Sequence, residues 1–149
     1  MSLNADPVVF GRVERVFFVR WRAPITDEAA TRVMAAMMEA RREAGHPLVN
    51  ISILPPESGE PTPDRSASIQ RRAPIAEHLC EVIYVVVPIT SPSREKWHRS
   101  AAHSDAITRM PVEMCDSASD ACHRAAVRLG LDAEALIDEA RRRELMDEG

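Results

Sequence analysis

The sequence predicts one α/β domain, with a mixed, mainly parallel sheet of four to five strands, helices packed against it and an extra C-terminal helix. Segments typical of strands alternate with segments typical of helices, and this alternation favours crossover connections between parallel strands. The run Val82–Ile89 is apolar on both of its sides, which is typical of a strand buried between two helix layers. We expect this strand to be the central member of the sheet.

The N-terminal part carries two strand-like runs, Val8–Phe10 and Val13–Trp21, on either side of Gly11-Arg12. They predict either a hairpin or one bent strand. The second run is dense in β-branched and aromatic residues, which suit a pleated surface.

The next segment has the signals of a helix at both of its ends. Thr26 is typical of an N-cap, acidic residues follow it, and Gly45 suits the left-handed position that ends a helix. Helical spacing predicts a buried face that fades at the polar Arg41. The apolar members of that face are Ala30, Val33, Met34, Met37 and Met38.

A strand is predicted over Leu48–Leu54, with Val49, Ile51 and Ile53 on one side and Leu48, Asn50, Ser52 and Leu54 on the other. The proline-rich stretch 55–63 then predicts an exposed loop. A helix opens at Thr62, is interrupted at Pro74 and ends by Cys80.

Beyond the apolar strand, residues 90–93 predict the cap of a helix with Trp97 on its inner side, followed by a short strand over Pro111–Cys115. Ser117 and Gly130 then bound the clearest helix of the chain. Its apolar stripe consists of Ala118, Ala121, Cys122, Ala125, Ala126 and Leu129. Asp132 caps a terminal helix, within 131–147, that runs to about Met146 and could dock on its own sheet or on a second copy.

Composition limits the classes of protein to consider. The 149 residues suit one domain, taken as 4–147, and residues 1–3 and 148–149 look like additions made for expression. The net charge of −4 argues against a general attraction to nucleic acid or membranes. Three cysteines without a close pair favour a reducing compartment, and no apolar run is long enough for a membrane span. We therefore expect a cytoplasmic protein with no nucleic-acid or membrane partner.

No catalytic, cofactor or metal site is predicted. The five histidines lack helical ligand spacing, and Cys115, Cys122 and His123 do not have the spacing of a zinc site. Cys115 precedes a helix N-terminus, which can lower a thiol pKa, although a buried packing role is commoner. The five glycines form no phosphate-binding loop.

Three serines are candidates for phosphorylation and for the control of partner binding: Ser58, Ser66 and Ser68. They lie in or just after the predicted exposed loop, where a phosphate would meet the N-terminus of the next helix. The alternative is that they are ordinary loop and cap serines.

The run from Val16 to Leu129 has a recognisable layout. It begins with a strand ending Trp21-Arg22-Ala23-Pro24, the helix 26–44 and the strand 48–54, followed by a loop and a helix. It continues with the strand 80–87, a helix, and the short strand Pro111–Met114 that leads into the helix 117–129. This layout resembles the STAS domain family of the anti-sigma-factor-antagonist type, and most closely the STAS-like proteins of myxobacteria. The resemblance implies a bacterial, non-catalytic signalling domain that binds a partner. It also implies a phosphorylated serine at a helix start, for which Glu57-Ser58-Gly59 and Asp64-Arg65-Ser66 are the nearest matches.

The leading hypothesis is therefore a non-enzymatic regulatory or scaffolding domain that binds a protein partner, with a homodimer left open. The alternative is an α/β domain that binds a nucleotide or lipid, or an enzyme, with its site at the carboxyl ends of the strands. Those ends are Leu54–Glu57, Ile89–Ser93 and Cys115–Ser117.

Overall fold

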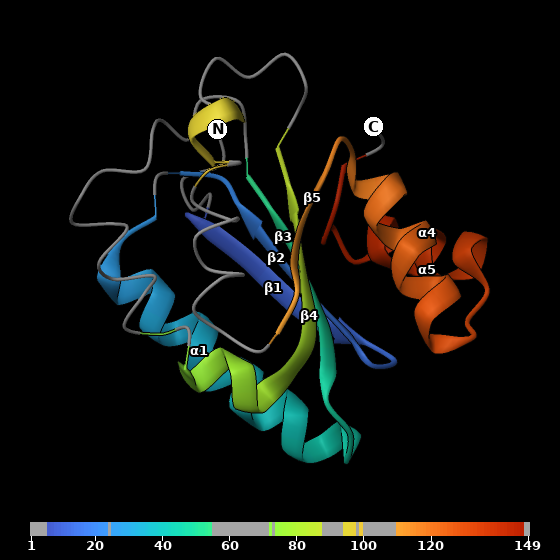
Figure 1. The fold of residues 1–149 in the computed structure, drawn as a ribbon, viewed down its shortest axis with the longest axis horizontal. Helices are drawn as coiled ribbons and strands as arrows, with labels where there is room; N and C mark the ends of the chain where they lie inside the picture. The colour runs from blue at the N-terminus through green and yellow to red at the C-terminus, as the bar shows by residue number, and fades with distance from the viewer. Residues whose placement is uncertain are drawn as a thin grey trace.

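The computed structural model describes residues 6–23, 25–54, 72, 74–87, 94–97, 99 and 110–147 (Figure 1). The five strands of this part form one sheet in which spatial order equals chain order, β1-β2-β3-β4-β5. β1 (Val8–Val13) is antiparallel to β2 (Val16–Trp21), and every further neighbouring pair is parallel. The further strands are β3 (Leu48–Ile53), β4 (Cys80–Val86) and β5 (Val112–Cys115). The predicted α/β class, with a mixed and mainly parallel sheet, is confirmed.

Helices cover both faces of the sheet (Figure 1). α1 (Asp27–Ala44) and the helical residues 74–79 lie on one face, and α4 (Ala118–Leu129) and α5 (Ala133–Arg142) lie on the other. Because each parallel strand is added on the same side of the previous one, right-handed crossovers bring their helices to one face. Two apolar cores result, one on each side of the sheet.

β4 is buried from both sides, as its composition predicts. Val82 and Tyr84 belong to the core under α4 and α5, while Ile83 and Val85 pack against the core under α1. Its predicted bounds and central place are wrong, because β3 is the middle strand and β4 begins at Cys80. β4 starts earlier than predicted because Cys80 already pairs with Leu48 of β3. Val49 pairs with Val82, which leaves Glu81 as an extra residue in a bulge. Residues 88 and 89 lie outside the described part.

The first two strands form a hairpin, which decides between the two predicted alternatives. The turn is Glu14-Arg15, and Gly11 lies inside β1 opposite Phe18. Glu14 has a φ of 54°, a left-handed conformation that usually favours glycine. Gly11 serves a close approach instead, because a Cβ there would lie 3.3 Å from Leu145 Cδ2.

The helix boundaries read from the sequence are confirmed at their caps. Thr26 Oγ1 accepts a hydrogen bond from the Ala29 amide, and Ser117 Oγ accepts one from Asp120. Gly45 and Gly130 have φ angles of 72° and 70° and close α1 and α4. The predicted stripe of α4 is confirmed, with five of its members buried and Leu129 packed against them.

The buried face of α1 differs from the predicted one by a small rotation about the helix axis. Its buried residues are Ala29, Val33, Met37 and Ala40, whereas Met38 is 54% exposed. The small residues Ala29 and Ala40 allow close contact with the sheet, so the stripe follows them and leaves Met38 outside it. The predicted faces of β3 are confirmed, because Val49 and Ile51 enter one core and Leu48 enters the other.

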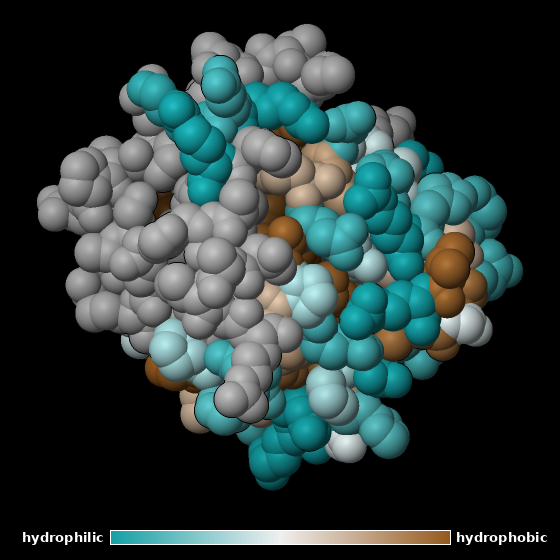
Figure 2. Space-filling model, viewed as in Figure 1, coloured by the Kyte–Doolittle hydropathy of each residue, from teal (hydrophilic) through white to brown (hydrophobic). Residues whose placement is uncertain are grey.

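The terminal helix is shorter than predicted and packs within its own chain. Asp132 caps α5 as expected, but the helix ends at Arg142 because Glu144 takes a left-handed φ of 60°. This turn brings Leu145 and Met146 into the core, where each is 2% exposed. The visible face in Figure 2 is mostly hydrophilic over α4 and α5. Within the described part, no helix has the length and apolar character needed to cross a bilayer.

Candidate functional site

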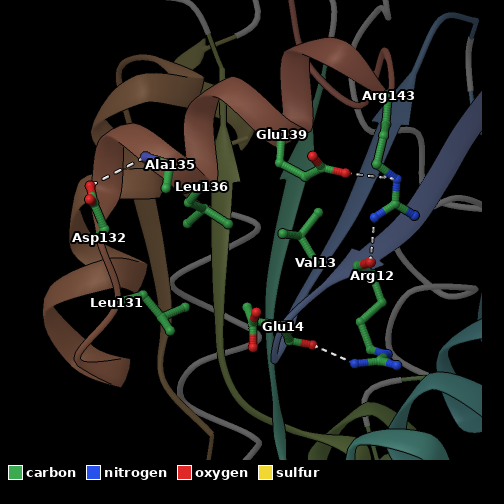
Figure 3. A pocket seen from close by; sticks show the side chains of 9 residues that line it. All are labelled: Arg12, Val13, Glu14, Leu131, Asp132, Ala135, Leu136, Glu139 and Arg143. Atoms are coloured by element: carbon green, nitrogen blue, oxygen red, sulfur yellow. Dashed lines mark hydrogen bonds and ion pairs between the residues drawn. The ribbon is translucent and has the colours of Figure 1, made fainter.

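A cleft of about 600 Å³ opens between the β1–β2 hairpin and α5 (Figure 3). Apolar side chains form its floor, and charged side chains of both signs stand around them. The floor consists of Val13, Leu131, Ala135 and Leu136. The charged residues are Arg12, Glu14, Asp132, Glu139 and Arg143.

Two tight chain reversals build the cleft. At one side, the two-residue turn at Glu14 ends the hairpin. At the other, Gly130 closes α4 in a left-handed conformation and Asp132 caps α5 by accepting from the Glu134 and Ala135 amides. The Leu131 amide donates to the Ala126 carbonyl at 2.9 Å, which fixes the link between the two helices. The walls therefore belong to ordered elements, which hold the side chains in place.

Arg12 and Arg143 lie at one end of the cleft, where each guanidinium binds a backbone carbonyl. Arg143 Nη1 donates to the Arg12 carbonyl at 2.8 Å, and Arg12 Nη1 donates to the Glu14 carbonyl at 2.8 Å (Figure 3). Arg143 Nε also lies 4.0 Å from Glu139 Oε2. Figure 3 shows Asp132 and Leu131 at the opposite end, with Val13 and Leu136 between the two groups.

Glu139 is the carboxylate that links the cleft to the outer side of α5. It accepts hydrogen bonds from Arg142, and this contact, together with the charges of Arg142 and Arg143, lowers the pKa of its carboxyl. Glu139 therefore stays ionised at neutral pH and presents a negative charge beside the apolar floor. A ligand that fits the cleft needs an apolar group for the floor and polar or charged groups at its rim.

No family model matches this chain, and no curated protein or solved structure matches it either. Membership of the STAS domain family therefore stays a prediction. The geometry of the chain's own residues is the basis for a functional proposal.

A second charged cluster lies around the bulge in β4, at the end of the sheet where β3 and β4 begin. Glu81 accepts from Arg15 Nη2 at 2.9 Å, and its other oxygen lies 3.5 Å from Arg128 Nε. Arg15 also donates to the Pro47 carbonyl, through Nε at 3.1 Å and Nη2 at 2.9 Å. The cluster ties the hairpin, the start of β3, β4 and α4 together, so its role is to fix the frame that carries the cleft.

The three cysteines are buried, and burial raises the pKa of each thiol to about 12. For Cys115, burial supports the packing role and raises the pKa of the thiol instead of lowering it. The helix that follows it is capped by Ser117, and the thiol of Cys115 belongs to the core, where only 1% of the residue is exposed. Thiols with such pKa values are almost fully protonated at neutral pH and are poor nucleophiles.

Cys122 and His123 are neighbours in sequence but point to different environments. Cys122 Sγ lies inside the core, 3.8 Å from Met146 Sδ. His123 is exposed, with its Nε2 3.8 Å from Glu134 Oε1. Within the described part of the chain, no group of three or more His, Cys, Asp or Glu side chains could hold a metal ion.

The candidate phosphorylation sites Ser58, Ser66 and Ser68 lie outside the described residues. So do residues 55–57 and 88–93 at the carboxyl ends of the strands. At that end of the strands, Arg94 donates to the Val87 carbonyl and to the Asp116 carboxylate. Three exposed ion pairs lie away from the cleft or on its outer side: Arg42 binds Glu39, Arg72 binds Asp27 and Arg142 binds Glu139.

The cleft was not predicted from the sequence. Its walls come from segments about 130 residues apart, and Arg12 to Arg143 is a separation of 131 residues. The available signal was local, namely the polar pair Glu14-Arg15 between two apolar runs, which could have placed the hairpin turn.

Proposed function

We propose that this chain is a non-catalytic, STAS-like regulatory or scaffolding domain that acts by binding a partner protein. The observation that carries the proposal is the cleft between the hairpin and α5. It combines an apolar floor with charged groups of both signs, as the centre and rim of a protein interface do.

The arrangement of the fold supports the same proposal. Within the described residues, β2, α1, β3, β4, β5 and α4 follow one another in the order that the resemblance implies, and their strands are parallel. Its thiols are packing residues with raised pKa values. Control of partner binding by phosphorylation at Ser58, Ser66 or Ser68 remains part of the proposal.

Capture of partners with matched charge reversals tests the function. The bait is the whole chain as the native protein, as Arg12→Glu in the cleft, and as Glu43→Arg on the exposed outer side of α1. The native protein and the Glu43→Arg variant should retain the same partner from a lysate of the source cells, and the Arg12→Glu variant should lose it. Unchanged melting temperatures would show that all three baits are folded.

Two results would contradict the proposal. One is equal capture by all three baits, which would place any interface elsewhere. The other is a specific rise in melting temperature with a nucleotide, lipid or acyl compound and no protein partner, since a ligand that binds only the folded state stabilises it by mass action. The second result would favour the alternative of a small-molecule site.

A further inference from the structure

The chain after α5 returns to the sheet and is anchored there. Glu144 takes a left-handed φ of 60°, and the Leu145 amide donates to the Ala140 carbonyl at 2.8 Å, which closes the helix. Leu145 and Met146 then enter the core, where each is 2% exposed. We call the segment 144–147 the C-terminal clasp, because these contacts fix its path over the sheet.

Arg20 joins β2 to both ends of the clasp. It lies two positions after Phe18, so it is on the sheet face that α4 and α5 cover. Its Nη1 donates to the Glu144 carbonyl at 3.1 Å, and its Nη2 forms an ion pair with the Asp147 carboxylate. The Arg20 side chain is only 17% exposed, and the planar fork of a guanidinium suits two acceptors at fixed positions.

Arg143 directly precedes the clasp and connects the two walls of the cleft. Its backbone follows the end of α5, and its Nη1 reaches the Arg12 carbonyl of the hairpin at 2.8 Å. On the α5 side, its Nε lies 4.0 Å from Glu139 Oε2 (Figure 3). Its Nη2 lies close to β1 as well, since a Cβ added to Gly11 would stand 3.3 Å from it. The position of Arg143 therefore sets the shape and the charge of this end of the cleft.

We infer that Arg20 is a positioning residue for partner binding, which acts through the clasp to place Arg143 across the end of the cleft. This inference rests on the proposed function, because it concerns the same site. Arg20 is not among the residues that line the cleft, so its effect on binding has to pass through another group. Fixing the backbone and the contacts of an arginine before the partner arrives lowers the conformational entropy that is lost on binding.

A purely stabilising role is the alternative for Arg20, since the clasp also carries two core residues. The two roles predict different results in a double-mutant cycle. If Arg20 acts through Arg143, its removal weakens binding in the native chain but has no further effect once the Arg143 side chain is absent. If Arg20 only stabilises the fold, its removal lowers the melting temperature and leaves binding by the folded chain unchanged.

The first measurement uses the whole ¹⁵N-labelled chain without a partner. The Nε–H signal of Arg143, assigned by its loss in Arg143→Ala, reports the mobility of this side chain through its ¹H–¹⁵N NOE. Arg20→Ala should lower this NOE from that of an ordered group towards that of a mobile one. Asp147→Ala should have a smaller effect, because the bond from Arg20 to the Glu144 carbonyl remains. Arg22→Ala removes an exposed arginine just after β2 and is the matched control, which should leave the NOE unchanged.

The second measurement is the depletion of the captured partner from the lysate of the source cells by increasing amounts of immobilised chain. Arg20→Ala and Arg143→Ala should each need about fivefold more bait than the native chain for half depletion, as expected for the loss of one hydrogen bond. The double variant should need no more than Arg143→Ala, and Arg22→Ala should match the native chain. Melting temperatures show that each bait is folded. Asp147 is 74% exposed, so Asp147→Ala gives a folded test of the clasp even if Arg20→Ala does not fold, and its smaller loss should also vanish when the Arg143 side chain is absent.

An unchanged NOE of Arg143 in Arg20→Ala would overturn the inference, and so would equal losses from Arg20→Ala with and without the Arg143 side chain. If Arg12→Glu loses the partner while Arg20→Ala retains it in full, the inference fails and the proposed function stands. If the native chain captures no partner that depends on Arg12, the proposed function fails, and the role of Arg20 in partner binding fails with it.

Discussion

Leu145→Ala tests whether the segment after α5 is part of the core. Leu145 follows the left-handed turn at Glu144 and is 2% exposed. Its side chain packs where Gly11 leaves room on β1. The substitution removes three buried carbon atoms at about 0.8 kcal/mol each and leaves a cavity. The free energy of unfolding should therefore fall by about 3 kcal/mol.

Urea unfolding, followed by the fluorescence of the buried Trp21, measures this change. The melting temperature should fall by roughly 6–12 °C, since each kcal/mol is worth about 2–4 °C in a domain of this size. Val127→Ala is the control, because Val127 is 85% exposed on α4 and its truncation should change stability by less than about 0.5 kcal/mol. If Leu145→Ala were as stable as Val127→Ala, the packing of this segment against β1 would be refuted.

Three further predictions concern buried groups and backbone conformation. Burial raises the pKa of Cys122 to about 12 in the folded chain, so the free energy of unfolding should be constant with respect to this thiol below about pH 9 and should fall as the pH rises towards 12. In urea unfolding, Cys122→Ala should show a smaller fall over this pH range than the native chain. Asn50 donates to the Phe17 carbonyl at 2.9 Å, so Asn50→Asp should be destabilising at neutral pH and less so at about pH 4, where a protonated carboxyl can donate. Equal losses of unfolding free energy at the two pH values would contradict this. Gly45→Ala should lower stability by about 1 kcal/mol in thermal unfolding through backbone strain alone, because φ is 72° and nothing lies within 4 Å of the added Cβ; an unchanged melting temperature would contradict it.

The features that could be predicted from the sequence are those set by neighbouring residues. Thr26, Ser117 and Asp132 cap helices because their side chains reach amides two or three positions ahead. Gly45 and Gly130 end helices because glycine tolerates a left-handed conformation. Burial of β4 on both faces was also predictable, since its composition leaves no polar side.

The features that were not predicted depend on contacts between distant segments. Gly11 looked like a turn residue, but it lies inside β1, where an added Cβ would stand 3.3 Å from Leu145 Cδ2. The turn instead uses Glu14 in a conformation that glycine usually takes. The end of α5 was misplaced for a related reason, because an apolar Leu145 can extend a helical stripe or enter the core after a turn, and spacing alone does not distinguish the two.

The same long-range contacts couple the core to the cleft. Leu145 fixes the segment after α5 against β1, and Arg20 holds it from β2 through the Glu144 carbonyl and the Asp147 carboxylate. Arg143 lies just before these anchors, so its position over the Arg12 carbonyl follows from them. The Arg143 side chain can change position without moving the anchored backbone, because Leu145 remains buried on the face of the sheet. Such a movement costs one exposed hydrogen bond, from Arg143 to the Arg12 carbonyl, while the core stays intact.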